Sequence, residues 1–408
     1  MNPEADFRIV VKGVRTDTTN TRQNSISPVP SMKDVIVIGA GPAGATAAKV
    51  IASSGFEVQL VEKRKPSQPK VCGGGMPYDL SRILSLPEHV VEKRVSYQVH
   101  HFPWGKRVSH EQHVTVRREV FDNFLAGEAV KSGAQLSYET VVDSVRKEGK
   151  STVVYARTKG GEVVCTPCKM VIFADGVSTL ASKTFPSLGF KATPKNTAIA
   201  ATYELSFKDN SMDYYDLYYG SQISPWGYGW IFPKRDSLNV GVGCLLSDLR
   251  KSQQNIKYLL DRFYATALQN ADMSLKDKAI TEFGAAMIPL SQSPRIFGPS
   301  CLAVGDAAGM VDPLLGCGIV HAVASGRLAG LVALGALASE DFSESYMSRY
   351  QVLWQQSSGC RNMKKNEQRA RVSHHFSTLD KNTISKMEHL LFFKDCSSLL
   401  ENLRVLFS

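Results

Sequence analysis

The stretch DVIVIGAGPAGATAAKVIASSGFEVQLVEKRK, residues 34–65, decides the fold. Its first apolar residues, 35–38, are β-branched and predict a buried strand. Gly39, Gly41 and Gly44 follow in a G-x-G-x-x-G pattern and open a helix of small residues that ends near Ser53. A second strand, EVQLVEK, carries Glu62 about 20 positions after the glycines. The stretch is therefore a complete βαβ unit.

A βαβ unit with these glycines predicts a dinucleotide site. Gly39 permits the tight turn, Gly41 lets the backbone approach a diphosphate, and Gly44 lets the helix pack against the strand. The helix N-terminus favours the negative phosphates. Glu62 is expected to accept hydrogen bonds from ribose hydroxyls, and its charge opposes a 2′-phosphate. The neighbouring positions Ala43 and Lys63 complete the expected contact set.

Composition describes a globular chain with a basic surface. The 408 residues are 43% hydrophobic and carry a net charge of +10. We expect no nucleic-acid partner, because no RNA-binding signature or long basic run is present. The eight cysteines are scattered, which predicts reduced thiols in the cytoplasm. Cys165 and Cys168 form a lone C-x-x-C in a segment that reads as strand, turn, strand, and we expect no metal site.

Two later segments identify the dinucleotide. VIFADGVSTLASK (171–183) is a strand that ends in Asp175 and Gly176, and PSCLAVGDAAGMVDPLLGCGIVHAVASGRLA (299–329) is a strand that ends in Gly305 and Asp306. With the first motif, both resemble FAD enzymes of the para-hydroxybenzoate-hydroxylase type. The resemblance implies FAD, with Asp306 at the ribityl chain and a helix beginning near Gly318 aimed at the flavin. The further implied contacts are Gly316 and Ile319.

A third segment agrees with this superfamily. VTVRREVFDNFLAGEAVKSGAQL (114–136) resembles its R-x-x-F-D-x-x-L helix. The matching arginine is Arg118, which the resemblance places on the cofactor. The alternative is an arginine exposed at the start of a surface helix.

Two motifs point to one family within the superfamily. YGWIFPKRDSLNVGVG (228–243) resembles the Y-x-W-x-F-P motif of geranylgeranyl reductases, and Gly241 and Gly243 supply its G-x-G ending. PKVCGGGMPYDL (69–80) supplies that family's cysteine–glycine motif at Cys72 and Gly73. The CGGG sequence differs from the acidic form of this motif in archaeal ether-lipid reductases. The resemblance spans residues 32–338.

The aromatic motif also has a direct physical reading. Residues 213–245 alternate as strands and predict an antiparallel sheet, in which Tyr228, Trp230 and Phe232 share one face at period two. Pro233 ends the strand. Three rings on one face form either an ordinary core or the wall of a pocket for a polyprenyl chain. We favour the wall, with Tyr228, Trp230 and Cys72 as candidate catalytic residues.

The resemblance implies an FAD-dependent reductase that saturates double bonds of a geranylgeranyl group. A monooxygenase or halogenase is one alternative, although halogenases carry W-x-W-x-I-P where this chain has Tyr228 and Phe232. A flavoprotein that binds prenyl lipid without reducing it is another. The sequence leaves open the electron donor, whether NAD(P)H, ferredoxin or another reductant. It also leaves open the prenyl substrate, whether a diphosphate, a chlorophyll, an ether lipid or a quinone.

The expected fold class is α/β: a Rossmann-like FAD-binding domain, an antiparallel-sheet substrate domain and a C-terminal helical region. No transmembrane helix is expected, since residues 319–338 contain His321 and Arg327 and read as a buried helix. A basic patch at 364–371 and an apolar block at 390–393 suggest peripheral contact with a membrane. The expected segments are a leader at 1–31, FAD-binding parts at 32–76, 114–185 and 296–338, substrate-domain parts at 77–113 and 186–295, and helices at 339–408.

Overall fold

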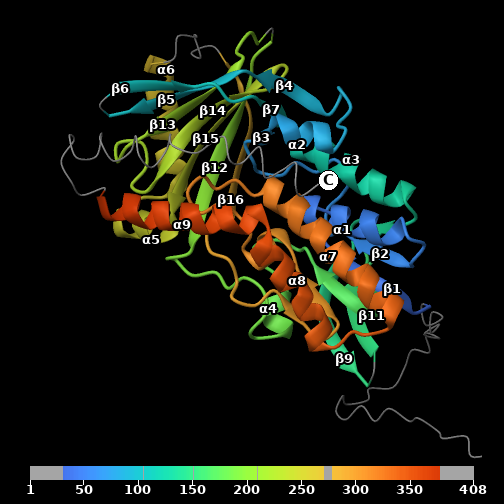
Figure 1. Cartoon of the computed structure of the whole chain (residues 1–408). Helices are drawn as coiled ribbons and strands as arrows, with labels where there is room; N and C mark the ends of the chain where they lie inside the picture. The colour runs from blue at the N-terminus through green and yellow to red at the C-terminus, as the bar shows by residue number, and fades with distance from the viewer. Residues whose placement is uncertain (1–30, 104, 150, 209, 271–277, 377–408) are drawn as a thin grey trace, which may run out of the picture.

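Two β-sheets stand side by side, with helices packed around them (Figure 1). The computed structural model describes residues 31–103, 105–149, 151–208, 210–270 and 278–376. Almost all of the expected leader and the apolar block at 390–393 lie outside these residues.

The first sheet is built on the predicted βαβ unit. Strand β1 (Lys33–Ile38) pairs in parallel with β2 (Val58–Val61) on one side and β11 (Val163–Phe173) on the other. The order β17-β18-β11-β1-β2-β8 is completed by β8 (Gln135–Ser137), β18 (Cys301–Ala303) and β17 (Phe297–Gly298). A hairpin of β9 (Val141–Glu148) and β10 (Ser151–Arg157) extends β11. The parallel centre of this sheet confirms the Rossmann-like expectation.

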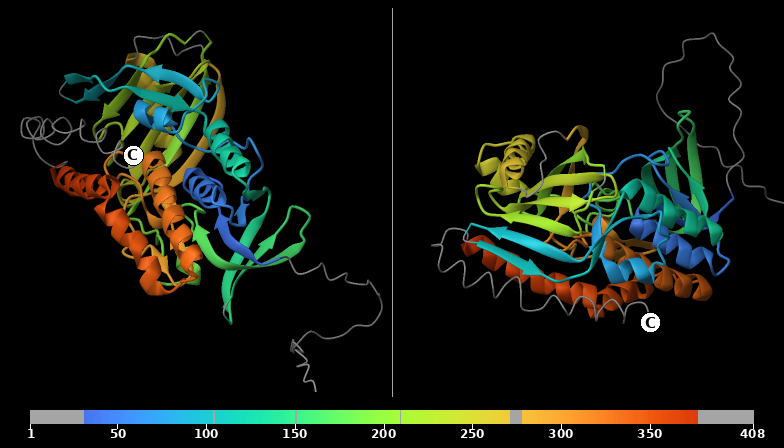
Figure 2. Two further views of the ribbon diagram at one scale, coloured as in Figure 1. Left: turned by 45° about the vertical axis from the view of Figure 1, so that its right-hand side comes forward. Right: turned by 90° about the horizontal axis from the view of Figure 1, so that it is seen from above.

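Helices of small residues cover this sheet. Helix α1 (Pro42–Ala52) lies beside α7 (Ile319–Ser339) in Figures 1 and 2. A Cβ on Gly326 would lie 2.1 Å from the carbonyl oxygen of Ala43, so the two backbones meet directly. Helix α3 (Arg118–Lys131) packs on the other side of α1. Helices α8 (Glu344–Gln356) and α9 (Ser358–Phe376) follow α7 and confirm the helical C-terminal region over the described residues.

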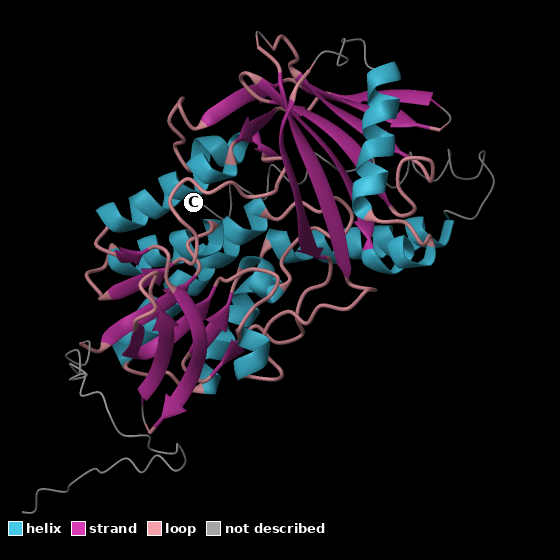
Figure 3. Ribbon diagram, turned by 180° about the vertical axis from the view of Figure 1, so that it is seen from behind, coloured by secondary structure: helices cyan, strands magenta, loops and turns pink. Residues whose placement is uncertain are grey.

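The second sheet is the expected antiparallel one. Its order is β16-β12-β15-β14-β13-β5-β6. The strands are β5 (Tyr97–Phe102), β6 (Gly105–Ser109), β12 (Thr197–Ser206), β13 (Tyr214–Tyr219), β14 (Gly227–Pro233), β15 (Ser237–Leu245) and β16 (Ile280–Pro289). All pairs are antiparallel except β5 with β13. Helix α6 (Ile256–Asn270) covers one face (Figure 3), and α5 (Leu246–Lys251) packs against β15 and β12.

Shorter elements connect the two sheets. A three-stranded sheet in the order β3-β7-β4 contains β3 (Gly75–Pro77), β7 (His113–Val116) and β4 (Val91–Val95). The remaining elements are α2 (Tyr78–Ile83), α4 (Ala181–Thr184) and the 3-10 turn η1 (Gly305–Ala308). Because β3 begins at the last glycine of the CGGG sequence, this small sheet places that sequence between the two larger sheets.

Helix α7 is the one described helix that is long and apolar enough to cross a membrane. Within the protein, 67% of its most apolar window is buried. It packs against α1 and α8, which is the arrangement of a core helix.

The reading of C-x-x-C as strand, turn, strand is wrong. Cys165 and Cys168 both lie within β11, three residues apart, where Cys165 is exposed and Cys168 buried. The intervening Pro167 is tolerated because β11 pairs with β10 alone at that point and meets β1 only from Cys168 onward. The two thiols therefore cannot act as a pair.

Candidate functional site

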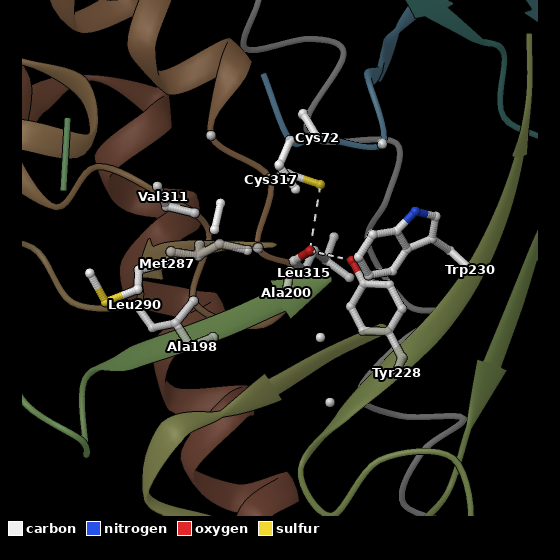
Figure 4. A pocket seen from close by; sticks show the side chains of 18 of the residues that line it. Cys72, Ala198, Ala200, Tyr228, Trp230, Met287, Leu290, Val311, Leu315 and Cys317 are labelled. Carbon is white, nitrogen blue, oxygen red and sulfur yellow. Dashed lines mark hydrogen bonds between the residues drawn. The ribbon is translucent and has the colours of Figure 1, made fainter. Parts of the chain in front are cut away.

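A cavity of about 570 Å³ lies where the two sheets meet (Figure 4). Its walls come from the start of α1, the CGGG sequence, α3, the second sheet and the segment that leads into α7. Fourteen of the expected site residues line it: Gly41, Ala43, Cys72, Gly73, Arg118, Gly176, Tyr228, Trp230, Phe232, Gly243, Asp306, Gly316, Gly318 and Ile319. The other expected residues lie outside the lining: Gly39, Gly44, Glu62, Lys63, Asp175, Pro233, Gly241 and Gly305.

The start of α1 forms an open cradle. Gly41 is the N-cap residue, and a Cβ added to it would meet nothing within 4 Å. Gly39 adopts a φ of +103°, and a Cβ on Gly44 would lie 1.9 Å from the carbonyl oxygen of Gly39. The Glu62 carboxylate accepts hydrogen bonds from the backbone N–H groups of Ala40 and Arg64, both at 2.9 Å. An anion can therefore approach the α1 N-terminus, which fits the diphosphate of FAD.

A second helix N-terminus faces the same cavity. Gly318 is the N-cap of α7, as expected, and Gly316 adopts a φ of +66°. Asp306 lies close by, since a Cβ on Gly318 would be 3.3 Å from its Oδ1. Asp312 holds the segment in place by accepting hydrogen bonds from the N–H groups of Leu314 and Leu315, each at 2.9 Å. The α7 N-terminus thus directs its dipole into the cavity.

Asp175 uses its carboxylate locally. It accepts hydrogen bonds from Thr179 Oγ1 at 2.7 Å and from the N–H of Leu180 at 2.6 Å. Burial raises the pKa of this carboxyl group. The side chain therefore closes the turn after β11, and its neighbour Gly176 lines the cavity.

Arg118 is buried at the start of α3, so the alternative of an exposed surface arginine does not apply. Its Nε and Nη2 donate to the two carboxylate oxygens of Asp122 at 2.8 and 2.9 Å. Burial lowers the pKa of the guanidinium, but Asp122 and Cys72 outweigh it and raise that pKa above its usual value. Arg118 is thus a fixed positive charge beside Cys72.

Lys70 is a cavity residue that the sequence reasoning missed. Burial lowers the pKa of its ammonium group, and the charge of Arg118 lowers it further, against smaller opposing effects of Asp122 and Asp306. The available signal was its place two residues before Cys72 in a segment already assigned to the cofactor. Two cations in the lining of one cavity favour an anionic ligand there.

The three rings of the motif line the cavity and also pack into one hydrophobic cluster around Trp230. Tyr228, Trp230 and Phe232 alternate on β14 and all line the cavity. The ring of Tyr215 on β13 stacks on the ring of Phe232 with 4.0 Å between their centroids. The ring centroids of Tyr219 and Tyr228 lie 5.7 Å apart. Burial raises the pKa of Tyr228 well above its ordinary value.

Gly241 and Pro233, two of the expected substrate-binding residues, do not line the cavity themselves. A Cβ on Gly241 would lie 2.2 Å from the Trp230 ring, so this glycine leaves the space that the indole fills. The carbonyl oxygen of Pro233 accepts a hydrogen bond from Thr115 Oγ1 at 2.6 Å. Gly241 therefore shapes the cavity through Trp230, and Pro233 connects β14 to β7 through its backbone.

Cys317 lines the cavity together with Cys72, and sequence reasoning missed it. Although Cys317 is exposed by surface area, desolvation within the cavity raises the pKa of its thiol, and Asp312 and Cys72 add to the effect. Its Sγ lies 3.8 Å from the carbonyl oxygen of Leu315. The same oxygen accepts a hydrogen bond from the Tyr228 hydroxyl (Figure 4). The signal for Cys317 was its position one residue before the expected helix start.

Comparison with known families and proteins agrees with this geometry. The family model of the geranylgeranyl reductase catalytic domain matches residues 196–287, and that of FAD dependent oxidoreductases matches residues 34–183. The digeranylgeranylglycerophospholipid reductase of Methanocaldococcus jannaschii is 32% identical over 79% of this chain and 82% of its own length. Digeranylgeranylglycerophospholipid reductase 2 of Methanothermobacter thermautotrophicus is 32% identical over 91% of this chain and 98% of its own.

Solved structures show the same fold. A geranylgeranyl bacteriochlorophyll reductase-like protein of Thermoplasma acidophilum has a TM-score of 0.78 at 27% identity, covering 91% of this chain and 96% of its own. The flavin-dependent halogenase CmlS has a TM-score of 0.69 at 20% identity, covering 93% of this chain and 70% of its own. The halogenase likeness is one of fold alone. The expected FAD cofactor is confirmed, and the chain belongs to the geranylgeranyl reductase family of FAD-dependent oxidoreductases.

Proposed function

We propose that this reductase saturates the geranylgeranyl chains of an ether phospholipid, and that the site residues described above carry out the reaction. The observation that supports it most directly is a single cavity in which an aromatic wall meets two helix N-termini. The names of the archaeal relatives favour a digeranylgeranylglycerophospholipid over a diphosphate, a chlorophyll or a quinone. The CGGG sequence differs from the acidic form of the motif in ether-lipid reductases and so argues against this substrate. The identity of the substrate is therefore tested first.

The chain offers a consistent set of contacts for FAD. Gly41 and Ala43 line the cavity at the α1 N-terminus and would hold the diphosphate, with Lys70 and Arg118 as nearby cations. Glu62 would bind the adenosine ribose and Asp306 the ribityl chain. When bound and reduced, FAD supplies the hydride for reduction of a carbon–carbon double bond. The α7 N-terminus would stabilise negative charge on the reduced ring.

Apolar side chains complete the cavity and exclude water from the double bond. Apolar side chains that line the cavity with the rings of β14 include Ala198, Ala200, Met287, Leu290 and Val311 (Figure 4), together with Ile288. A prenyl chain has no hydrogen-bonding group, so it gains from such a surface by burial alone. An isolated alkene is unpolarised, and the protein therefore acts mainly by holding it close to the cofactor in a dry site.

The carbon that does not receive hydride needs a proton, and we assign it to Cys72. The thiol lines the cavity, and the N–H of Gly74 donates to its Sγ at 3.3 Å, which fixes its direction. Tyr228 and Trp230 would then position the chain, since the Tyr228 hydroxyl and the Trp230 indole N–H already donate to protein acceptors.

Contact with an anionic membrane surface is part of the proposal. Helix α9 carries Arg361, Lys364 and Lys365 at exposed positions, and Asn366 on the same helix donates to Asp312 Oδ2 at 2.6 Å. Asp312 begins the segment that forms one wall of the cavity, so the basic helix adjoins the substrate site. Basic residues beside a lipid-binding cavity favour anionic headgroups. The electron donor, whether NAD(P)H, ferredoxin or another reductant, would act on the bound cofactor.

The proposal is tested with FAD-loaded protein reduced by dithionite under anaerobic conditions. Digeranylgeranylglycerol phospholipid, geranylgeranyl diphosphate and menaquinone are offered separately, and products are analysed by mass spectrometry. We expect the phospholipid to gain two hydrogens for each double bond reduced. Reduction of another substrate in its place would overturn the assignment, and oxygen uptake in proportion to turnover would point to a monooxygenase.

A further inference from the structure

The indole of Trp230 is held on three sides. Its Nε1 donates a hydrogen bond to Asn239 Oδ1 at 2.9 Å. The ring fills the space left by Gly241 on the neighbouring strand β15. A Cβ on Gly73 would lie 3.2 Å from Nε1, so the CGGG backbone passes beside the same edge of the ring. The side of the indole that carries the N–H is therefore fixed between Asn239 and the cofactor-side loop.

The orientation of the Asn239 amide is itself determined by a charge. Its Nδ2 donates to Glu204 Oε2 at 3.0 Å, and both side chains are buried. A carboxylate can only accept, so the amide nitrogen must face Glu204 and the amide oxygen must face Trp230. A flipped amide would place oxygen against the carboxylate and N–H against the indole N–H.

Glu204 stays ionised because its surroundings are built to receive a negative charge. Lys234 Nζ donates to it at 3.1 Å and Ser237 Oγ at 2.5 Å. Arg117 Nη1 lies 3.6 Å from Glu204 Oε1, the oxygen that also accepts the Ser237 hydroxyl hydrogen bond. Burial alone would raise the pKa of Glu204, but Lys234 and the hydrogen bonds from Ser237 and Asn239 lower it below its usual value. The chain from Glu204 through Asn239 to Trp230 is thus fully hydrogen-bonded.

We propose that Asn239 is a positioning residue of the reductase, which fixes the Trp230 indole against the prenyl chain, and that Glu204 fixes Asn239. The proposal rests on the proposed function, in which Trp230 is part of the substrate wall. A small error in the position of a reacting group costs a large factor in rate. A freely turning indole would change the shape of the cavity at the level of the CGGG loop. The structure assigns to Asn239 the task of preventing that rotation.

The test is a double-mutant cycle in the FAD-loaded protein. Asn239→Leu removes the acceptor at similar size, and Trp230→Phe removes the donor. We expect Asn239→Leu to lower kcat/KM for the prenyl substrate about tenfold, because it removes the buried acceptor of the indole N–H together with the donor to Glu204. In the Trp230→Phe background, Asn239→Leu should have little further effect, because it acts through the indole. Equal losses in both backgrounds would overturn the proposal.

A spectroscopic measurement separates failure of this inference from failure of the proposed function. The indole N–H resonance of Trp230 is assigned as the signal that Trp230→Phe removes. We expect this signal to shift in Asn239→Leu, with or without any substrate. An unchanged resonance would contradict the hydrogen bond itself, whatever the substrate proves to be.

The matched control removes a hydrogen bond on the opposite face of β12, the strand that carries Glu204. Tyr203 is next to Glu204 on β12. Its hydroxyl donates a hydrogen bond at 2.5 Å to Oδ1 of Asp261, a residue of α6. Tyr203→Phe should leave kcat/KM and the Trp230 resonance unchanged. If Tyr203→Phe reproduced the loss seen in Asn239→Leu, general weakening of the sheet would explain both, and the positioning role would be rejected.

Discussion

The hydroxyl of Tyr228 donates a hydrogen bond to the backbone carbonyl oxygen of Leu315 at 2.5 Å. This contact joins β14 of the second sheet to the segment that leads into α7 (Figure 4). Asp312, at the start of the same segment, accepts hydrogen bonds from the N–H groups of Leu314 and Leu315. The aromatic residues of β14 and the segment before the α7 N-terminus are therefore joined by a direct hydrogen bond.

Tyr228→Phe should lower the rate of prenyl reduction about two- to tenfold, which corresponds to the loss of one hydrogen bond. The ring stays in place, so FAD content should remain that of the parent protein. The measurement is kcat with dithionite-reduced protein, together with the FAD absorbance per chain. Full activity in Tyr228→Phe would show that the Leu315 contact has no part in catalysis.

Cys72→Ala should slow product formation at least about 100-fold if the thiol delivers the proton. FAD should still bind and still accept electrons, because the alanine occupies less space in the cavity. The matched control is Cys165→Ala, which removes an exposed thiol on β11 that is not part of the cavity lining. Equal single-turnover rates for Cys72→Ala and the parent protein would remove the catalytic role of Cys72.

Sequence reasoning succeeded where neighbours along the chain determine the structure. The glycines after β1 and the alternation of Tyr228, Trp230 and Phe232 are local patterns, and both lie where they were expected. The roles of other residues depend on contacts between distant segments. Gly241 matched a motif for substrate contact, yet its position is explained by the ring of Trp230 on another strand. No local pattern could reveal that contact.

Lys70, Cys317 and Asn239 illustrate the same limit for the site itself. Lys70 and Cys317 enter the cavity because their loops meet there, and Asn239 is linked to Trp230 across a strand pair. The strand containing Cys165 and Cys168 was misread because Pro167 usually interrupts strands, whereas this part of β11 has a partner on one side only. Sheet order was not predictable from the local sequence.

Lys70→Met should weaken FAD binding about tenfold and stabilise the protein without FAD. Burial and Arg118 lower the pKa of Lys70 below 10.5, so the unfolded chain binds this proton more readily than the folded one. Stability of the FAD-free protein should therefore rise with pH between the lowered pKa and 10.5, and this part of the rise should vanish in Lys70→Met. Bound anionic FAD compensates the charge. Equilibrium dialysis and melting curves with and without FAD measure both effects, and unchanged FAD affinity would refute the cationic contact.

Two alanine substitutions in the first motif should separate cofactor binding from folding. Gly41 has a φ of −71° and open space where a Cβ would lie, so Gly41→Ala should change the stability of the FAD-free protein by less than about 0.5 kcal/mol. The added methyl group faces the approach of the diphosphate, and FAD affinity should fall at least about tenfold. Gly44→Ala would bring its methyl group within 1.9 Å of the Gly39 carbonyl oxygen and should destabilise the fold itself. Melting curves of the FAD-free proteins and FAD absorbance per chain distinguish the two effects. A Gly41→Ala protein that retains its full FAD content would show that the diphosphate does not rest on this turn.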